Sequence, residues 1–381
     1  IKRYPKLTEI SAWRVDRNDE DWRHWTPIKE GEKSTYGGFY TQEEVRQIVA
    51  YAAARQITIV PEIEMPGHSS EIFAAYPELS CKGEVLPVRP ASYWPIEDIF
   101  CAGNDSVFVF LENILDEVVD LFPGRYIHIG GDEARKTYWK TCEKCQNRIK
   151  AEGLADEDEL QSWFIQKMET FIISKGKQLI GWDEILEGGL APGATVMSWR
   201  GVKGGVAAAK AGHDVIMTPT SHVYFDYYQG DPKTEPQAIG GYTTLKKVYD
   251  YEPIPEALNA EEAKFVLGSQ ANLWTEFIKT TSHAEYMVLP RMTALSEVLW
   301  SAKDQRDWPG FQKRLESLLP RFETLGWNYS PGTFLVDIVP GRPLQKDEVE
   351  VQLIAEQAKY DIRYTLDGGD LDESSLLYTG K

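Results

Sequence analysis

Short apolar runs alternate along the chain with longer segments in which apolar residues recur every three or four positions. The short runs predict buried strands, whereas the three-to-four spacing predicts amphipathic helices. Six strands are predicted in this way: Ile57–Ile63, Tyr126–Ile129, Gln178–Trp182, Ala194–Trp199, Asp214–Thr218 and Phe265–Ala271. Because strands that alternate with helices form parallel β/α units, the pattern predicts an α/β fold around a parallel sheet.

Four helices have clear sequence signals: Thr41–Arg55, a segment from Asp105 to Phe122, Ser282–Trp300 and Asp307–Leu325. Thr41 and Glu44 form a capping box for the first, and Asp105 is the candidate cap of the second. Asp183–Gly193 is too short and too rich in glycine and proline for a full helix. The long Tyr-, Pro- and Gly-rich connection Pro219–Glu262 is expected to form an active-site rim.

The pattern changes after Pro331 to alternating apolar and polar residues, which is typical of exposed strands. Strands are predicted over Phe334–Ile338, Val349–Ile354 and Asp361–Leu366, with a turn at Gly368–Asp370. Too few strands follow to close a sandwich. We therefore predict a partial β/α barrel over residues 1–330 and a truncated C-terminal β domain over residues 331–381.

The charge balance excludes some functions. Basic residues number 41 against 59 acidic ones, a net charge of −18, and the basic residues are scattered, which disfavours a nucleic-acid partner. No apolar run approaches the roughly 18 residues that a membrane span needs.

The chain has four cysteines, Cys81, Cys101, Cys142 and Cys145, of which the last two form a CxxC pair. An even number permits disulfides in an oxidising compartment, and buried structural thiols are equally compatible. Structural zinc would need a second ligand pair, and the nearest histidines, His128 and His213, stand in strand-like contexts. We therefore expect disulfides or simple structural thiols and no metal.

Carboxylates cluster after the predicted strands: Glu62 and Glu64, Asp132 and Glu133, Asp183 and Glu184, and Glu276. Any one such pair can simply cap the next helix. Together, at the carboxyl ends of parallel strands, they indicate an active site in which repulsion and burial raise at least one pKa. Glu133 is the better candidate for a general acid, because Gly130 and Gly131 before it permit a tight turn.

Aromatic residues occur at the same strand ends. Trp182, Trp199 and Trp274 lie at or just beyond strands, and Tyr224 with Asp226 lies in the long connection. A single tryptophan is usually core, but three beside acids suggest a flat-walled pocket for a ring with apolar faces and polar edges. A pyranose sugar has this character.

Six motifs then show a resemblance: TIVPEIEMPGH (Thr58–His68), YIHIGGDE (Tyr126–Glu133), IGWDEIL (Ile180–Leu186), VMSWRG (Val196–Gly201), YFD (Tyr224–Asp226) and ANLWTE (Ala271–Glu276). In type and order they resemble bacterial β-N-acetylhexosaminidases of glycoside hydrolase family 20, over about Ile1 to Leu325. The segment Asp361–Lys381 resembles the start of the small β-sandwich that follows the barrel in many of these enzymes. The resemblance implies a (β/α)8 TIM-type barrel.

The resemblance also implies a substrate-assisted retaining mechanism on a carbohydrate, with no cofactor or metal. Glu133 would protonate the leaving-group oxygen while the acetamido oxygen of the substrate attacks the anomeric carbon, giving an oxazolinium ion. Asp132 would orient the acetamido nitrogen and stabilise its developing charge. Water would then open the oxazolinium ring with Glu133 as base.

Further roles follow only from the resemblance. Trp182, Trp199 and Trp274 would wall the sugar pocket, Tyr224 would bind the acetamido oxygen, and Asp226 and Glu276 would hold sugar hydroxyls. Glu64 and His68 would form a relay behind the acid, although His68 could instead only cap the turn after Pro66 and Gly67. Export to the periplasm, the cell surface or the medium is expected, since most bacterial members are exported.

Family members have two further barrel strands before the stretch that matches Ile1, carrying a substrate-binding Arg and an Asp. We locate neither here, and six strands do not close an eight-stranded barrel. The chain is therefore expected to be a fragment or to be completed by another segment, and to be poorly folded or inactive alone. Two alternatives are a catalytically silent carbohydrate-binding barrel and a metal-dependent hydrolase with His68, Glu64, Asp132 and Glu133 as ligands.

Overall fold

The computed structural model describes residues 1–18, 25–91, 96–332, 336–345, 348–355 and 361–380. The chain forms two compact units. The first comprises Ile1–Met217 with Pro255–Leu267, and the second comprises Thr218–Ile254 with Gly268–Lys381. The division differs from the expected domain boundary between residues 330 and 331, which stays a prediction.

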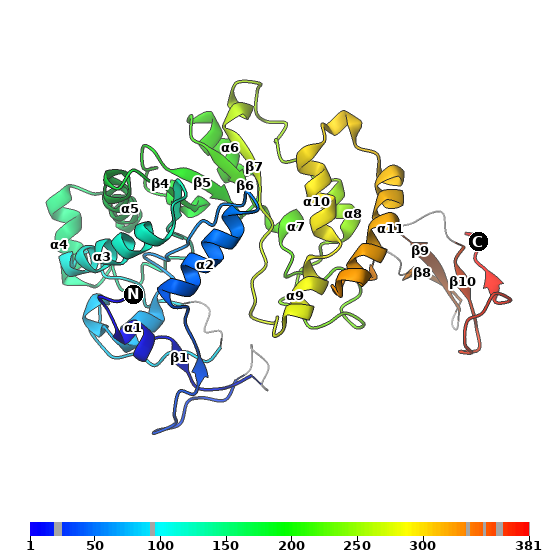
Figure 1. Cartoon of the computed structure of the whole chain (residues 1–381), viewed down its shortest axis with the longest axis horizontal. Coiled ribbons are helices and arrows are strands. Elements are labelled where there is room, and N and C mark those ends of the chain that lie inside the picture. Colours follow the sequence, from blue (N-terminus) through cyan, green and yellow to red (C-terminus); the bar gives the residue numbers. More distant parts are fainter. Residues whose placement is uncertain (19–24, 92–95, 333–335, 346–347, 356–360, 381) are drawn as a thin grey trace. The chain divides into compact units, whose positions relative to one another are not determined.

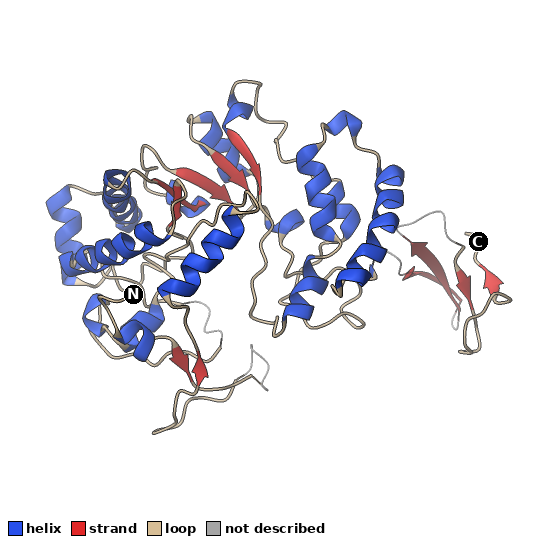
Figure 2. Ribbon diagram, in the orientation of Figure 1, coloured by secondary structure: helices blue, strands red, loops and turns tan. Residues whose placement is uncertain are grey.

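The central feature is a five-stranded sheet with the strand order β3-β4-β5-β6-β7 (Figure 2). Its strands are β3 (Tyr126–His128), β4 (Gln178–Trp182), β5 (Thr195–Ser198), β6 (Val215–Met217) and β7 (Val266–Ser269). The first four pair in parallel. Each lies inside a predicted strand, so the α/β class and the parallel sheet are confirmed, while closure into an eight-stranded barrel stays a prediction.

The predicted buried strand Ile57–Ile63 is only partly confirmed. Its end runs parallel to β3, since Glu62 bridges His128 and the backbone N–H of Ile63 donates to the carbonyl of His128 at 2.9 Å. Its beginning is exposed, with Ile57 at 56% and Val60 at 40% of full exposure. Among the described residues, this segment pairs only with β3, on one of its two sides. Its apolar side chains Ile57 and Val60 therefore remain exposed to solvent.

The first unit also contains helices, two short strands and 3-10 turns (Figure 1). They are α1 (Lys6–Glu9), β1 (Trp13–Arg14), β2 (Tyr36–Gly37), α2 (Gln42–Ala53), η1 (Ser70–Ala74), η2 (Pro77–Leu79), α3 (Asp105–Leu121), α4 (Glu143–Glu152), α5 (Glu157–Ser174), η3 (Asp183–Leu186), α6 (Lys203–Lys210) and η4 (Glu262–Phe265). α5 packs on β4, and α6 packs on β5 and β6. As predicted, only the short η3 connects β4 to β5.

Two helix starts test the capping predictions. The Thr41–Glu44 capping box is present at α2. At α3, however, the cap is Asn104, whose side chain accepts the N–H of Ser106 at 3.1 Å, so the assignment to Asp105 was wrong by one residue. Asn104 has the extended backbone that a cap needs, while Asp105 is already helical and pairs with Arg148.

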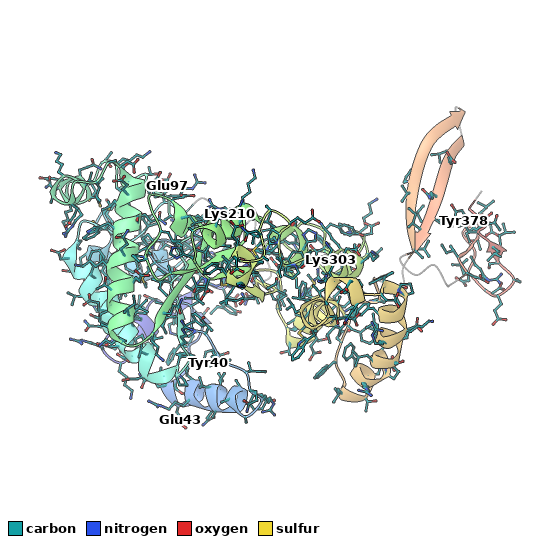
Figure 3. The ribbon with its side chains drawn as sticks, turned by 90° about the horizontal axis from the view of Figure 1, so that it is seen from above. Tyr40, Glu43, Glu97, Lys210, Lys303 and Tyr378 are labelled. Atoms are coloured by element: carbon teal, nitrogen blue, oxygen red, sulfur yellow. The ribbon has the colours of Figure 1, made fainter. Side chains whose placement is uncertain are left out.

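α2 lies largely in solvent. Tyr40, just before it, is 74% exposed, and Figure 3 shows Tyr40 and Glu43 at this end of the helix. Of its predicted apolar face only Ala52 is buried, and Ile48 is 42% exposed. None of the described helices is both long and apolar enough to cross a membrane.

The second unit is mainly helical up to residue 325. Its elements are α7 (Thr220–Val223), α8 (Leu245–Tyr249), α9 (Thr281–Val288), α10 (Arg291–Trp300), η5 (Lys303–Gln305) and α11 (Trp308–Leu325). The predicted single helix Ser282–Trp300 is two helices, because Pro290 has no N–H with which to continue the first. α11 has the predicted bounds within one residue and is capped by Asp307.

Strands follow α11, as the alternating pattern predicts. β8 (Val336–Gln345) and β9 (Glu348–Ala355) form an antiparallel pair, and β10 (Arg363–Tyr364) pairs with β11 (Leu376–Leu377). The predicted start of the first strand at Phe334 lies outside the described residues. Gly368, in the predicted turn, has a φ of +73°.

Candidate active site

The turn that follows β3 has the tight geometry that its two glycines predict. Gly130 and Gly131 have φ angles of +70° and +94°, and Glu133 has a φ of +46°, which is unusual for a residue with a side chain. A Cβ at Gly130 would lie 1.6 Å from Oε2 of Glu64, so only glycine leaves room for that carboxyl group. The Gln161 side chain donates to the Gly131 carbonyl at 2.8 Å and holds the turn on α5.

His68 joins the two predicted catalytic carboxylates. Its Nε2 lies 3.3 Å from Oδ2 of Asp132 and 3.5 Å from Oε2 of Glu133. The two loops also touch through their backbones, because a Cβ at Gly67 would lie 2.9 Å from the carbonyl oxygen of Asp132. The structure thus brings together Glu64, His68, Asp132 and Glu133, four of the residues singled out from the sequence.

The charges of this group are strongly coupled. Hydrogen bonds to Asp132 and Glu133 raise the pKa of His68 to about 11, against the opposing effect of burial, so the imidazole is cationic at neutral pH. Burial, together with the negative charges of Asp132 and Glu62, raises the pKa of Glu64 to about 10. Oε2 of Glu64 and Oδ1 of Asp132 are buried without a hydrogen-bond partner. One imidazolium and one neutral carboxylic acid therefore accompany the two catalytic candidates.

Trp182 lies deeper than a pocket wall would. It is only 2% exposed and packs with Ile180 and Met197, and its ring meets the edge of His128 at a centroid distance of 4.8 Å. Its indole N–H donates to Oε1 of Glu62 at 3.0 Å. Burial alone would raise the pKa of Glu62, but hydrogen bonding and attraction to His128 hold it at about 2. Glu62 was noted among the strand-end acids without a role, and its position orients Trp182.

Trp199 is half-buried at the end of β5 and contacts a second carboxylate. Its indole N–H donates to Oε2 of Glu184 at 2.8 Å. Burial raises the pKa of Glu184 to about 7, although Trp199 and Arg200 oppose this. Arg200 also lies 3.2 Å from Asp183. Glu184 was not chosen as a site residue, although it belongs to the quoted WDE stretch and follows a strand directly.

In the second unit, two predicted aromatic residues meet. Tyr224 bridges Asn272 in parallel, and the N–H of Phe225 donates to the Asn272 carbonyl at 2.7 Å. Burial raises the pKa of Tyr224, although the neighbouring Asn272 and Trp274 side chains oppose this. Tyr224 is 7% exposed and Trp274 is 39% exposed, so Trp274 offers an open ring beside a buried hydroxyl.

Two predicted acids of the same unit, Asp226 and Glu276, interact electrostatically. Burial first, and then the charge of Glu276, raise the pKa of Asp226 to about 7, while the positive charge of Arg291 lowers it. Oδ1 of Asp226 and Oε2 of Glu276 are buried without a hydrogen-bond partner. Each therefore has an acceptor available for a hydroxyl group.

Arg291, which sequence reasoning missed, holds the loop of Asp226 in place. Its side chain is fully buried and donates to the carbonyls of Phe225 and Met287, to that of Tyr227 at 3.0 Å, and to that of Thr243 at 2.9 Å. The nearby carboxylates do not outweigh burial, which lowers the Arg291 pKa to about 9. A buried arginine at the start of a helix has no sequence signal that separates it from a surface arginine.

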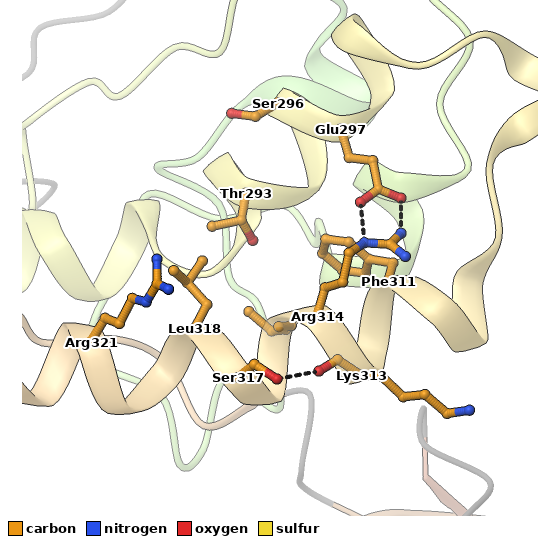
Figure 4. Close-up of a pocket in the computed structure, with 10 residues that line it drawn as sticks. Thr293, Ser296, Glu297, Phe311, Lys313, Arg314, Ser317, Leu318 and Arg321 are labelled. Atoms are coloured by element: carbon orange, nitrogen blue, oxygen red, sulfur yellow. Dashed lines mark hydrogen bonds and ion pairs between the residues drawn. The ribbon is translucent and has the colours of Figure 1, made fainter.

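A hollow of about 660 Å³ lies between α10 and α11 (Figure 4). Its lining includes the ion pair between Arg314 and Glu297, at 2.6 Å. None of the predicted site residues lines it. The active-site candidates are therefore defined by the clusters above.

Comparison with known proteins gives a consistent family. The family described as "Glycosyl hydrolase family 20, catalytic domain" matches residues 1–303. A beta-hexosaminidase of Porphyromonas gingivalis is 50% identical over 331 residues, covering 86% of this chain and 40% of that protein. A beta-hexosaminidase of Vibrio furnissii is 37% identical over 301 residues, covering 78% of this chain and 48% of the relative. The chain thus spans less than half the length of these relatives.

Solved structures agree. The beta-N-acetylhexosaminidase from Bacteroides fragilis has a TM-score of 0.71 at 33% identity, covering 87% of this chain and 63% of that one. The exo beta-N-acetylglucosaminidase from Vibrio harveyi, in complex with N-acetylglucosamine, has a TM-score of 0.74 at 32% identity, covering 87% and 52%. With its catalytic-domain match over most of its length, the chain belongs to glycosyl hydrolase family 20.

Proposed function

We propose that the protein is an exo-acting β-N-acetylhexosaminidase that removes terminal β-linked N-acetylglucosamine or N-acetylgalactosamine by substrate-assisted catalysis. The observation that carries the proposal is the placement of Asp132 and Glu133 on one tight turn, both within 3.5 Å of His68. Relatives named as beta-hexosaminidases, and one solved in complex with N-acetylglucosamine, support the substrate class.

In the first step, Glu133 gives its proton to the glycosidic oxygen as the bond from that oxygen to the anomeric carbon breaks. The acetamido oxygen of the substrate forms the new bond to the anomeric carbon, so the intermediate is an oxazolinium ion held without an enzyme nucleophile. Asp132 accepts the acetamido N–H through its unpartnered Oδ1 and stabilises the positive charge that develops there.

In the second step, Glu133 takes a proton from water as the water attacks the anomeric carbon, and the acetamido group is restored. The His68 imidazolium lies against both carboxylates. Glu64, with a pKa of about 10, stays neutral and adds no third negative charge behind them.

The sugar ring is assigned to the remaining residues. In the first unit, the family resemblance gives Trp199 the role of a sugar-facing wall. In the second unit, the same resemblance gives Trp274 such a role, gives the Tyr224 hydroxyl the acetamido oxygen, and gives Asp226 and Glu276, with their unpartnered oxygens, the sugar hydroxyls. By the same resemblance Trp182, which is 2% exposed, is a third wall.

The test compares hydrolysis of an aryl 2-acetamido-2-deoxy-β-glucoside with that of the matching aryl β-glucoside. Turnover of the first alone supports the proposal, because only that substrate carries the nucleophile. Equal turnover of both would require an enzyme nucleophile and overturn the mechanism. Turnover of neither would favour a carbohydrate-binding barrel, an alternative that the retained Asp132 and Glu133 make less attractive.

A metal-dependent hydrolase is not supported by the geometry. In the described ranges, His68, Glu64, Asp132 and Glu133 do not form a group whose ligand atoms converge as a metal site requires.

A further inference from the structure

The four cysteines, far apart in the sequence, converge at one point of the first unit. One side-chain sulfur from each of Cys81, Cys101, Cys142 and Cys145 lies within 4.8 Å of every other. Cys101 and Cys145 are fully buried, while Cys81 and Cys142 are half-buried. The second ligand pair that the sequence did not reveal is therefore Cys81 with Cys101, brought to the CxxC pair by the fold.

The sulfur spacing matches a tetrahedral metal site. Sγ of Cys101 lies 3.7 Å from Sγ of Cys142 and 3.7 Å from Sγ of Cys145, and Sγ of Cys81 lies 3.7 Å from Sγ of Cys145. Four sulfurs at about 2.3 Å from a zinc ion form a tetrahedron with edges of about 3.8 Å. A disulfide requires an S–S distance of about 2.0 Å. All four residues are free cysteines, which leaves four thiols available as ligands.

Rigid backbone contacts hold the sulfurs in place. The N–H of Cys101 donates to the Leu79 carbonyl at 2.9 Å, which holds the segment of Cys101 against the segment before Cys81. A Cβ at Gly103 would lie 2.4 Å from the N of Cys145, so this loop touches the first turn of α4 directly. The buried Trp139 indole donates to the Phe100 carbonyl at 2.9 Å and closes the other side.

The start of α4 suits thiolate ligands. Cys142 is the N-cap residue of this ten-residue helix, and Cys145 lies in its first turn. The positive end of the helix dipole and the free N–H groups there favour negatively charged sulfur. The helix start is thus a second argument for a metal site, beside the convergence of the four sulfurs.

We propose that Cys81, Cys101, Cys142 and Cys145 bind one zinc ion in a closed, structural tetrathiolate site. All four positions of a tetrahedral ion are then filled by protein, so the ion has no open position for substrate. The site ties the loop after His68, which contains Cys81 and Cys101, to the segment after Glu133, which contains Cys142 and Cys145.

The first experiment measures metal content and thiols, without any substrate. The protein is purified without added chelator or zinc, its metals are quantified by plasma mass spectrometry, and its thiols are counted after denaturation with a chelator. We expect one zinc ion and four thiols per chain. Two disulfides, four thiols with no metal, or one iron ion in place of zinc would each overturn the proposal.

A ligand variant with a matched control tests the assignment. Cys142→Ser removes a half-buried ligand at the helix cap, where serine is also accepted, and Thr141→Ser changes the exposed neighbour. We expect Cys142→Ser to lose most of its zinc, Thr141→Ser to keep one ion, and Cys142→His to retain zinc through a Cys3His site. If Cys142→Ser fails to fold, cobalt replaces zinc in the unchanged protein and should give the visible absorption of a tetrahedral tetrathiolate ion.

Retention of a full zinc ion by folded Cys142→Ser, or the absence of those cobalt bands, would refute the site. The inference does not rest on the proposed function. A protein without hexosaminidase activity would still hold zinc, and a metal-free protein could still cleave the acetamido substrate.

Discussion

Nε2 of His68 lies 3.3 Å from Oδ2 of Asp132, although the two residues come from loops 64 positions apart. Both loops need unusual backbone at this point, since His68 and Glu133 each have a φ of +46°. Such backbone costs free energy and persists where the surrounding contacts enforce it. The contact between His68 and Asp132 is therefore enforced by the packing of the two loops. A single substitution of His68 removes it.

We predict that His68→Asn lowers kcat/KM and changes how stability depends on pH. Asparagine accepts the left-handed backbone but carries no positive charge. The pKa of His68 rises from 6.5 in the unfolded chain to about 11 in the folded protein, so proton binding stabilises the folded state. That contribution is complete below pH 6.5 and is lost as the pH rises toward 11.

Urea unfolding of both proteins at pH 6.5, 8 and 10 tests this dependence. The deficit of His68→Asn should be largest at pH 6.5 and shrink at each step. A deficit that is constant across this range would show that the histidine is neutral and only packs in the turn.

Removing the acid should affect substrates unequally. Glu133→Gln cannot protonate the leaving group, so we expect a loss of about 10²- to 10⁴-fold on a poor leaving group such as a simple alkyl alcohol. A dinitrophenolate leaves without protonation, so its release should fall by less than about tenfold. Asp132→Asn should slow both substrates, because the acetamido group must attack in either case.

Steady-state kinetics of both variants on both substrates measures this pattern, with the exposed Asp120→Asn on α3 as the control. Equal losses for both leaving groups in Glu133→Gln would remove Glu133 from the acid role.

Local signals made much of the fold predictable. β4 has the predicted bounds, Gln178–Trp182, because its residues from Leu179 to Trp182 suit the buried centre of a parallel sheet. The Gly130–Gly131 turn was predictable because glycine tolerates positive φ. Such features depend only on neighbours in the sequence.

What could not be predicted depends on distant partners. Pairing of the Ile57–Ile63 segment depends on which strands lie on its two sides, and the pattern of its own residues is silent on this. That the N–H of Trp182 donates to Glu62, a residue 120 positions away, also has no signal in the sequence around either residue. The convergence of Cys81 and Cys101 with the CxxC pair could not be predicted, because it depends on the fold. The same holds for the burial of Arg291 against the Thr243 carbonyl.

Gly130 should be intolerant of any side chain. In Gly130→Ala the new methyl group would meet Oε2 of Glu64 at 1.6 Å and would also face a φ of +70°, so we expect a loss of about 3 kcal/mol or more in unfolding free energy. Gly153 is a matched control with a φ of +68° and nothing within 4 Å, and Gly153→Ala should cost only about 1 kcal/mol. Chemical denaturation of both variants separates steric conflict from backbone strain, and equal losses would mean that Glu64 moves aside freely.

Arg291 should be the most sensitive arginine of the second unit. In Arg291→Met, the carbonyls of Phe225, Tyr227 and Thr243 lose their buried donor, so we expect a destabilisation of about 3–5 kcal/mol. The exposed pair between Arg314 and Glu297 provides the contrast, and Arg314→Met should cost about 0–1 kcal/mol.

The same substitution should change the pH dependence of the neighbouring acid. Burial already raises the pKa of Asp226 to about 7 against a backbone hydrogen bond and the Arg291 charge, which both lower it, so Arg291→Met should raise that pKa further. Titration of Asp226 by carbon-13 NMR in folded protein measures this directly, with Arg314→Met showing no change. An unchanged Asp226 titration in Arg291→Met would mean that the arginine only satisfies loop carbonyls and does not tune the acid.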